Sequence, residues 1–355
     1  ESHLPRTPTP QRIKKRRDGP HENKRAKDEK HRHHWKAKDC PAWPGGANGI
    51  LRTDAFHSLG QALNFRPGKM TIITDERCTA YHSPGHPERP FRVSGPVKKL
   101  KAQTELKLEW LKPEPAPKAK VLRAHTTNHF QRLAEPHDFD GDTAYHDGIR
   151  DHALRSAGGA LKAAELAKAG KPNFSLLRPP GHHATKERAM GFCYLGSVAI
   201  AALEAKATGS KKVAVFDFDV HHGNGTEDIL AKRDGMAFFS IHQHPAYPGT
   251  GTESFDNCRN YTARPNLPRE DYRKTAEHAV ADLKAYDPDL VIVSAGFDAY
   301  AGDPLCNQKL SAEDFRWFGK TLAGLGVPVA SAMEGGYSDD LPDLVLAYLR
   351  GLLGK

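Results

Sequence analysis

The sequence predicts an α/β fold in which a mostly parallel sheet lies between two layers of helices. From Met70 onward, short apolar segments rich in Val, Ile and Phe alternate with longer segments of amphipathic helical spacing. This alternation is typical of parallel sheets covered by helices. Polar residues also cluster directly after several apolar segments, which is where such sheets bind ligands. A chain of 355 residues is long enough for one large domain of this class.

The individual elements follow from residue type and spacing. Strands are expected where β-branched and aromatic residues concentrate, at 71–75, 174–178, 212–219, 237–242, 290–296 and 327–333. Helices are expected where Ala, Leu, Lys and Glu recur with an apolar stripe, at 147–169, 194–207, 270–286, 311–325 and 340–353. No internal repeat is visible.

The amino-terminal segment 1–69 differs in composition from the rest of the chain. It holds 16 Lys and Arg against 7 Asp and Glu, whereas residues 70–355 hold 36 of each, so the whole net charge of +9 lies in this segment. Without sustained apolar periodicity it is expected to be disordered. A basic tail for nucleic acid or nuclear import, with loose metal binding at its histidines, is one interpretation. Because the first methionine is Met70, directly before a predicted strand, we favour an upstream extension or non-native leader, with the folded domain at 70–355.

Composition also limits the compartment. No apolar stretch approaches the ~20 residues of a membrane span, and no apolar signal region opens the chain. The five cysteines are odd in number, scattered and without a C-x-x-C pair, which argues against a disulfide framework. A cytoplasmic protein is expected, or a nuclear one if the source is eukaryotic and the basic tail is native.

The strongest chemical signal is the run from Asp217 to His221. It follows the apolar segment 213–216, and side chains two apart in a strand point to the same side, so Asp217, Asp219 and His221 should converge. An isolated D-x-H of this kind is usually a polar loop. Three further strand ends carry reactive groups, however, namely the pair His182 and His183, then Asp298, then Tyr337.

Taken together, these strand ends match the requirements of a catalytic zinc site. Such a site uses three nitrogen or oxygen ligands and keeps one position open. Asp219, His221 and Asp298 meet that requirement. The two histidines and Tyr337 remain for proton transfer and oxyanion stabilisation.

These residues resemble the zinc-dependent histone deacetylase family, which includes bacterial histone-deacetylase-like amidohydrolases and acetylpolyamine amidohydrolases. The resemblance covers about residues 70–353. It rests on seven motifs, at 86–90, 178–184, 191–194, 217–225, 248–251, 296–304 and 334–337. It implies the arginase/deacetylase fold, with an eight-stranded parallel sheet flanked by helices on both faces. It also implies zinc on Asp219, His221 and Asp298, although the same ligands accept Fe²⁺.

The resemblance also implies roles around the metal. His182 would be held by Asp217 and His183 by Asn224, a position where some family members carry Asp instead. His183, assisted by His182, would take the proton of the attacking water, and Tyr337 would stabilise the oxyanion. A potassium ion is implied on oxygens of Asp217, Asp219, His221, Ser240 and Ile241.

Substrate-binding positions follow from the same resemblance. Phe192, after Gly191, matches one aromatic wall of the channel for the acyl-lysine stem, and Tyr247 stands where the second wall is usually Phe. Asp142 aligns with a rim acid that holds substrate amides. Arg92 matches an arginine lining an internal channel behind the zinc. Leu305 is apolar where a polyamine-specific relative can carry glutamate, which favours acyl-lysine.

The function expected is therefore a metal-dependent hydrolase that removes acetyl or short acyl groups from lysine side chains of proteins or peptides. An acetylpolyamine amidohydrolase would share every catalytic residue. A different class would be an inactive deacetylase-like binding module with a nucleic-acid-binding tail. The intact set of ligands, histidines and Tyr337 argues against that alternative, and the single Asp-x-Asp-x-His array favours zinc over the two-manganese arginase branch.

Overall fold

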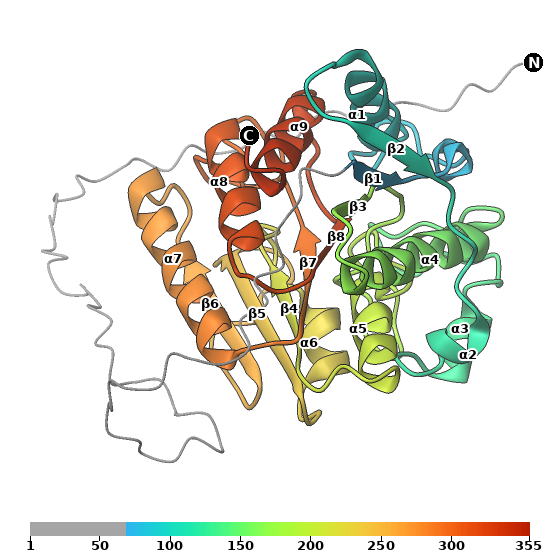
Figure 1. Ribbon diagram of the computed structural model, residues 1–355. Coiled ribbons are helices and arrows are strands. Elements are labelled where there is room, and N and C mark those ends of the chain that lie inside the picture. Colours follow the sequence, from blue (N-terminus) through green and yellow to red (C-terminus); the bar gives the residue numbers. More distant parts are fainter. Residues whose placement is uncertain (1–68) are drawn as a thin grey trace, which may run out of the picture. The chain divides into compact units, whose positions relative to one another are not determined.

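A computed structural model describes residues 69–355 of the chain, which form an eight-stranded sheet between helices (Figure 1). All neighbouring strands are parallel, and their order is β2-β1-β3-β8-β7-β4-β5-β6. The predicted fold class is thus confirmed. The basic segment 1–68 lies outside the described residues, so its predicted disorder stays a prediction.

The six predicted strands are all present, with ends shifted by up to three residues. The eight strands are β1 (Met70–Ile73), β2 (Leu108–Leu111), β3 (Asn173–Ser175), β4 (Val213–Asp217), β5 (Met236–Gln243), β6 (Cys258–Ala263), β7 (Leu290–Ala295) and β8 (Val329–Met333). The two that were not predicted, β2 and β6, are the edges of the sheet. An edge strand is only partly buried, and these two carry polar residues among the apolar ones, so neither shows the apolar run of a central strand.

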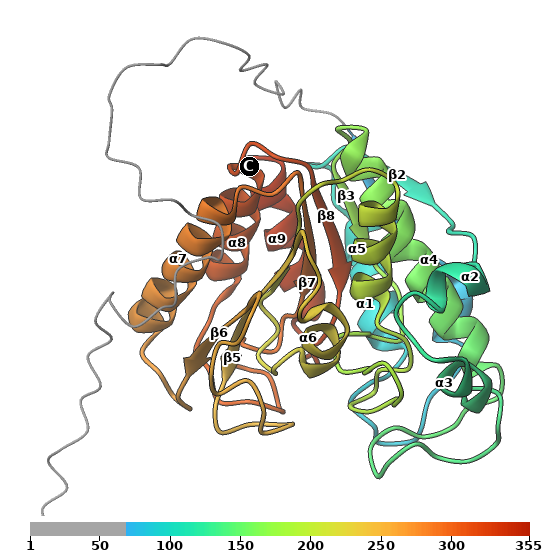
Figure 2. The ribbon, with the colours of Figure 1, turned by 90° about the horizontal axis from the view of Figure 1, so that it is seen from below.

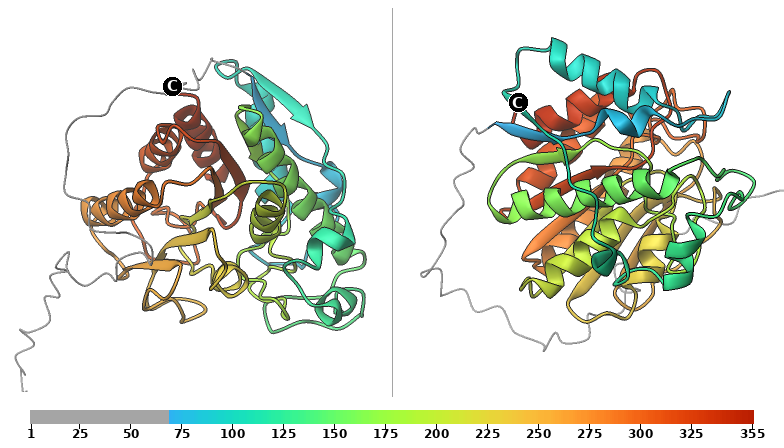
Figure 3. Two further views of the ribbon diagram at one scale, coloured as in Figure 1. Left: turned by 60° about the horizontal axis from the view of Figure 1, so that its bottom comes forward. Right: turned by 90° about the vertical axis from the view of Figure 1, so that its right-hand side faces the viewer.

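The helices form two layers, one on each face of the sheet (Figures 2 and 3). One layer holds α1 (Phe91–Ala102), α7 (Arg269–Tyr286), α8 (Ala312–Ala323) and α9 (Leu341–Leu352). The other holds α4 (Ile149–Lys168), α5 (Ser197–Ala207) and the short α6 (Asn224–Leu230). Two further short helices, α2 (Lys118–Val121) and α3 (Thr127–Arg132), precede α4.

The five predicted helices correspond to α4, α5, α7, α8 and α9. Helix α1 was not predicted because Gly95 and Pro96 lie inside it, and both residues normally lower helix propensity. None of the helices in the described part of the chain is long and apolar enough to cross a membrane.

The strand order determines where reactive groups meet. Strands β3, β8, β7 and β4 are consecutive neighbours at the centre of the sheet. Because they are parallel, their carboxyl ends lie at one edge, and the segments that follow them can approach one another. The core beneath is aromatic: Phe218 stacks on Phe318 with ring centroids 4.6 Å apart, and Tyr348 packs beside Phe218. This packing gives the strand ends a rigid base.

Candidate active site

The three predicted metal ligands meet in one buried group. Asp219 and His221 follow β4 and Asp298 follows β7, and one ligand atom of each lies within 4.8 Å of the others. The Nδ1 atom of His221 lies 3.2 Å from Oδ1 of Asp219 and 3.0 Å from Oδ2 of Asp298. Both carboxylates are fully buried. The structure therefore brings these three side chains together as expected.

The backbone reaches this arrangement differently from the way the sequence suggested. Strand β4 ends at Asp217, so strand alternation does not carry the run as far as His221. Instead, the N–H of Asp219 donates to Oδ1 of Asp217, and the N–H of His221 donates to Oδ1 of Asp219. Carboxylates that accept from the backbone two residues later form compact turns. The expectation that a strand reaches residue 219 was wrong. Asp219 and His221 do converge, whereas Asp217 lies against His182.

Glycine at position 335 is required for the same group to form. The Gly335 N–H donates to Oδ2 of Asp219 at 2.6 Å. A Cβ atom there would stand 2.1 Å from Oδ2 of Asp298 and 2.4 Å from Oδ2 of Asp219, well inside van der Waals contact. The motif at 334–337 thus lets the end of β8 close over the carboxylates.

The charge balance of this group fits a bound cation. Burial and the neighbouring carboxylate of Asp219 raise the pKa of Asp298 to about 7. Two buried carboxylates side by side are unfavourable unless a positive charge accompanies them. Two oxygen donors and one imidazole nitrogen form a donor set that Zn²⁺ accepts. The residues present therefore fit the metal that the sequence led us to expect.

The two adjacent histidines lie beside this group and differ in charge state. His182 Nδ1 lies 3.1 Å from Oδ2 of Asp217. Burial disfavours the cation of His182, but the carboxylates of Asp219 and Asp217 outweigh it and raise its pKa to about 10. His183 Nδ1 lies 2.7 Å from Oδ1 of Asn224. Burial and the positive charge of His182 hold the pKa of His183 well below its ordinary value, so it is neutral and able to accept a proton.

Tyr337 completes the arrangement from the segment after β8. Its backbone N–H donates to Oδ2 of Asp303 at 2.7 Å, and its ring meets Phe192 edge-on at 5.8 Å between centroids. Burial raises the pKa of the phenol well above its ordinary value, so the hydroxyl stays protonated and can donate. Asp303 was not predicted as a site residue, although it lies in the motif at 296–304.

A pocket of about 390 Å³ opens onto His183, His221 and Tyr337. It falls within the size range of small-molecule sites. Five of the six predicted substrate-binding residues line it, Gly191 among them, together with two that were not predicted, His86 and Pro87. The full lining is His86, Pro87, Asp142, His183, Gly191, Phe192, His221, Tyr247, Leu305 and Tyr337.

The aromatic side chains form the walls of this pocket. Tyr247 meets the His183 ring edge-on at 5.0 Å, and Phe192 meets the His86 ring edge-on at 4.6 Å. Gly191 lies against His183 and Tyr247. A Cβ at position 191 would stand 2.6 Å from Cδ2 of His183 and 2.8 Å from Cε1 of Tyr247. Asp142 is exposed at the rim, as is Leu305, whose exposed fraction is 38 %.

Three predicted residues lie outside the pocket lining and also outside the metal and histidine groups described above. Arg92 is buried, donates from Nε to the carbonyl oxygen of Gly336 at 2.8 Å and lies with its guanidinium over the Tyr337 ring. Ser240 pairs with Asp217 in the β4–β5 register, and its hydroxyl lies 2.9 Å from Nδ1 of His242. Ile241 follows it and is buried. The potassium site on these strands stays a prediction.

Comparison with known proteins agrees with this geometry. The protein-family model described as the histone deacetylase domain matches residues 86–352 of this sequence. A histone deacetylase-like amidohydrolase of Pseudomonas aeruginosa is 35 % identical over 263 residues, which is 68 % of this chain and 69 % of that protein. The acetylpolyamine amidohydrolase of Mycoplana ramosa is 34 % identical over 60 % of this chain and 66 % of its own length. A crystal structure of the HDA15 HD domain superposes with a TM-score of 0.76 at 31 % identity, covering 81 % of this chain and 90 % of that one. The chain therefore belongs to the histone deacetylase family and is a deacetylase, a hydrolase of amide bonds.

Proposed function

We propose that this deacetylase uses zinc to remove acetyl or short acyl groups from lysine side chains. The observation that carries the proposal is the pocket itself, in which Phe192 and Tyr247 flank a route to His183, His221 and Tyr337. Aromatic walls suit the aliphatic stem of a lysine, which has no polar group before its amide. The apolar Leu305 at the rim supports lysine over a polyamine, whose additional amines would favour an acidic residue.

Each residue of the site has a task in this proposal. Asp219, His221 and Asp298 would hold zinc, which, when bound, polarises a carbonyl group and lowers the pKa of water. Neutral His183 accepts the proton of the attacking water and later donates it to the leaving amine. His182, charged and held by Asp217, would assist by stabilising the negative charge that develops on the attacking water and the carbonyl oxygen. The Tyr337 hydroxyl donates to the carbonyl oxygen as negative charge develops on it.

Two accessory features belong to the same proposal. A potassium ion on oxygens of Asp217, Asp219, His221, Ser240 and Ile241 would stabilise the turn after β4, because hard cations prefer oxygen ligands. A reducing compartment such as the cytoplasm is supported by the four cysteines of the described residues, all free and buried. The partners would be acetylated proteins, peptides or small amines.

A substrate comparison tests the proposal. The full chain loaded with zinc is expected to hydrolyse acetyl-lysine peptides with a higher kcat/KM than acetylputrescine or acetylspermidine, and a chelator is expected to abolish turnover of all of them. A higher kcat/KM on the acetylated polyamines would overturn the lysine assignment. Activity that survives complete metal removal would overturn the metal-dependent mechanism.

Leu305→Glu provides a matched variant for this comparison. Because Leu305 is exposed at the rim and is not among the metal-ligating side chains, the substitution is expected to leave zinc content unchanged. It should raise the ratio of acetylpolyamine to acetyl-lysine turnover, since a carboxylate at the rim attracts the free amines of a polyamine. An unchanged ratio would show that residue 305 does not contribute to the choice between the two substrates.

Asn224→Asp tests the task of His183 through the pH dependence of the reaction. A carboxylate beside Nδ1 would stabilise the imidazolium, so the pKa of His183 would rise from its lowered value. The base must be neutral to act, so the acidic limb of kcat/KM is expected to move to higher pH in the variant. Gln131→Glu, which adds a negative charge on the exposed side of α3, serves as the control for net charge. Identical acidic limbs in the native protein and Asn224→Asp would contradict the assignment of His183 as the base.

A further inference from the structure

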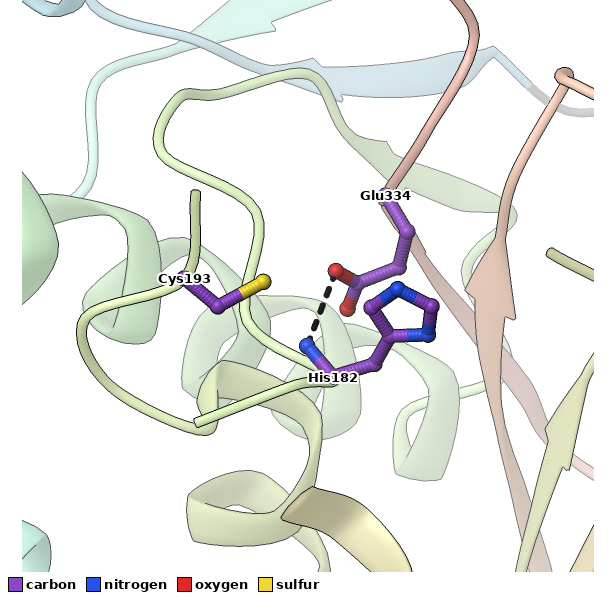
Figure 4. A group of neighbouring side chains, drawn as sticks. All are labelled: His182, Cys193 and Glu334. Carbon is purple, nitrogen blue, oxygen red and sulfur yellow. Dashed lines mark hydrogen bonds between the residues drawn. The ribbon is translucent and has the colours of Figure 1, made fainter. Parts of the chain in front are cut away.

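A second group of buried side chains of the metal-ligating kind includes the first histidine of the pair (Figure 4). It consists of His182, Cys193 and Glu334, with one ligand atom of each within 4.8 Å of the others. The three side chains come from different segments: the loop after β3, the segment before α5 and the end of β8. Their exposed fractions are 3 %, 0 % and 1 %. None of them belongs to the group of Asp219, His221 and Asp298.

The carboxylate of Glu334 is only half satisfied. Its Oε2 atom accepts from the backbone N–H groups of Gly181 at 2.6 Å and His182 at 3.1 Å. Its Oε1 atom is fully buried and has no hydrogen-bond partner among the described residues. Buried polar atoms are almost always paired, so an unpaired carboxylate oxygen indicates a missing positive or donating partner.

The other two side chains offer complementary donors. Nδ1 of His182 faces Asp217, which leaves Nε2 as the ring nitrogen available to a ligand. Burial raises the pKa of the Cys193 thiol well above its ordinary value and that of Glu334 to about 7. Both anions are therefore unfavourable without a cation, and a bound metal ion deprotonates a coordinating thiol.

We propose that His182, Cys193 and Glu334 bind a second divalent ion of the zinc class, and that this ion inhibits the enzyme. A thiolate and a carboxylate together balance the two positive charges of the ion, so the buried site becomes neutral. Imidazole nitrogen, thiolate sulfur and carboxylate oxygen are all ligands of Zn²⁺ and Co²⁺. Binding releases the thiol proton of Cys193 and the Nε2 proton of the charged His182 to solvent, with no change in oxidation state.

Inhibition follows from the shared histidine. His182 Nε2 lies 3.7 Å from Oδ1 of Asp219, so the ring stands between the two groups. An ion on Nε2 displaces the proton that this nitrogen carries in charged His182. The neutral loaded site then lacks the positive charge beside His183 that His182 provides in the proposed function. The binding of the ion is independent of the proposed function, whereas the inhibition rests on the task proposed there for His182. Excess metal should therefore reduce turnover.

The absorption spectrum of bound Co²⁺ distinguishes the two sites, because only the second site has a sulfur ligand. The metal-free full chain, kept reduced without added thiols, is titrated with Co²⁺ in a Cys40→Ser background, which removes the cysteine outside the described residues. The first equivalents should give only weak visible bands, and further Co²⁺ should give a thiolate-to-cobalt charge-transfer band in the near ultraviolet. Turnover on an acetyl-lysine peptide should then fall by about 10-fold or more, since proton-transfer groups contribute about 10²–10⁴-fold.

Two cysteine variants identify the sulfur. Cys306→Ser is the matched control, because Cys306 lies 3.4 Å from Nε2 of His221, beside the first group. The charge-transfer band should persist in Cys306→Ser and disappear in Cys193→Ser. Glu334→Gln should weaken the band, with the visible bands of the first site reporting that each variant is folded. In Cys193→Ser, further Co²⁺ should not reduce turnover below that variant's own starting value.

The outcomes are distinguishable. No charge-transfer band in the Cys40→Ser parent, or a band that survives in Cys193→Ser and is lost in Cys306→Ser, would overturn the second site. A band that appears without loss of turnover would establish the ion but overturn its inhibitory effect. A protein inactive at every metal level that still shows the Cys193-dependent band would contradict the proposed function and leave the second site standing.

Discussion

Replacing Tyr337 with Phe is expected to lower kcat by about 10²–10³-fold, the usual effect of removing one oxyanion donor. The phenol is buried, and its raised pKa keeps it protonated across the working pH range. Phenylalanine keeps the ring that packs against Phe192 and under the Arg92 guanidinium, so the pocket should keep its shape. Because Tyr337 is not among the metal-ligating side chains, zinc content should not change. KM should change little, since the lost interaction strengthens only in the transition state.

The measurements are steady-state kinetics on an acetyl-lysine peptide and metal content by elemental analysis. Tyr261→Phe is the matched control, because Tyr261 lies on the edge strand β6 and its hydroxyl donates to Asp282 at 2.6 Å, far along the sheet from β8. That variant should keep native turnover. If Tyr337→Phe kept full activity with a normal zinc content, the hydroxyl would have no part in stabilising the oxyanion. A large loss accompanied by loss of zinc would instead indicate a disturbed metal group.

The central features of the site could be predicted because they are local in sequence. Asp219 and His221 follow one apolar strand, and the histidine pair, Asp298 and Tyr337 each follow another. Parallel strands bring their carboxyl ends to one edge of the sheet. Recognising which segments are strands was therefore enough to predict that the residues following them lie together. The order of the strands was not needed, although it explains the result, since β3, β8, β7 and β4 are neighbours.

Other supporting contacts could not be predicted, because they join residues distant in the chain; those of His182 with Asp217 and of His183 with Asn224 were expected only from the family resemblance. Glu334 binds the backbone of Gly181 from 153 positions away, and Asp303 holds the N–H of Tyr337. No periodicity marks such pairs. Edge strands β2 and β6 were missed for a different reason: each carries polar residues among the apolar ones, so neither shows the sustained apolar run of a central strand. The sequence pattern therefore reports what is buried against the core, and not what a buried polar atom is paired with.

Replacing Glu88 with Gln is expected to destabilise the fold by about 3–5 kcal/mol, the cost of removing one partner from a buried ion pair. The Glu88 carboxylate accepts from Arg178 through both of its oxygens and from Nη1 of Arg92 at 3.1 Å. All three side chains are buried. Glutamine has the same shape but no charge, so two guanidinium groups would remain in the interior without a counterion. The motif at 86–90 thus has a structural role that its sequence did not reveal.

Urea unfolding of both proteins at two pH values tests this expectation. Burial opposes ionisation of Glu88, but Arg178 outweighs it and lowers the pKa of the carboxyl below 4.5. A lowered pKa contributes stability that is present above the unfolded pKa and lost as the pH falls through the folded one. The difference between native protein and Glu88→Gln should therefore be full at pH 7 and shrink below about pH 4. Glu76→Gln is the matched control, since Glu76 pairs with Lys112 on the surface and should cost far less. Equal losses in the two variants, or a difference that does not change with pH, would show that the charge of Glu88 does not stabilise the fold.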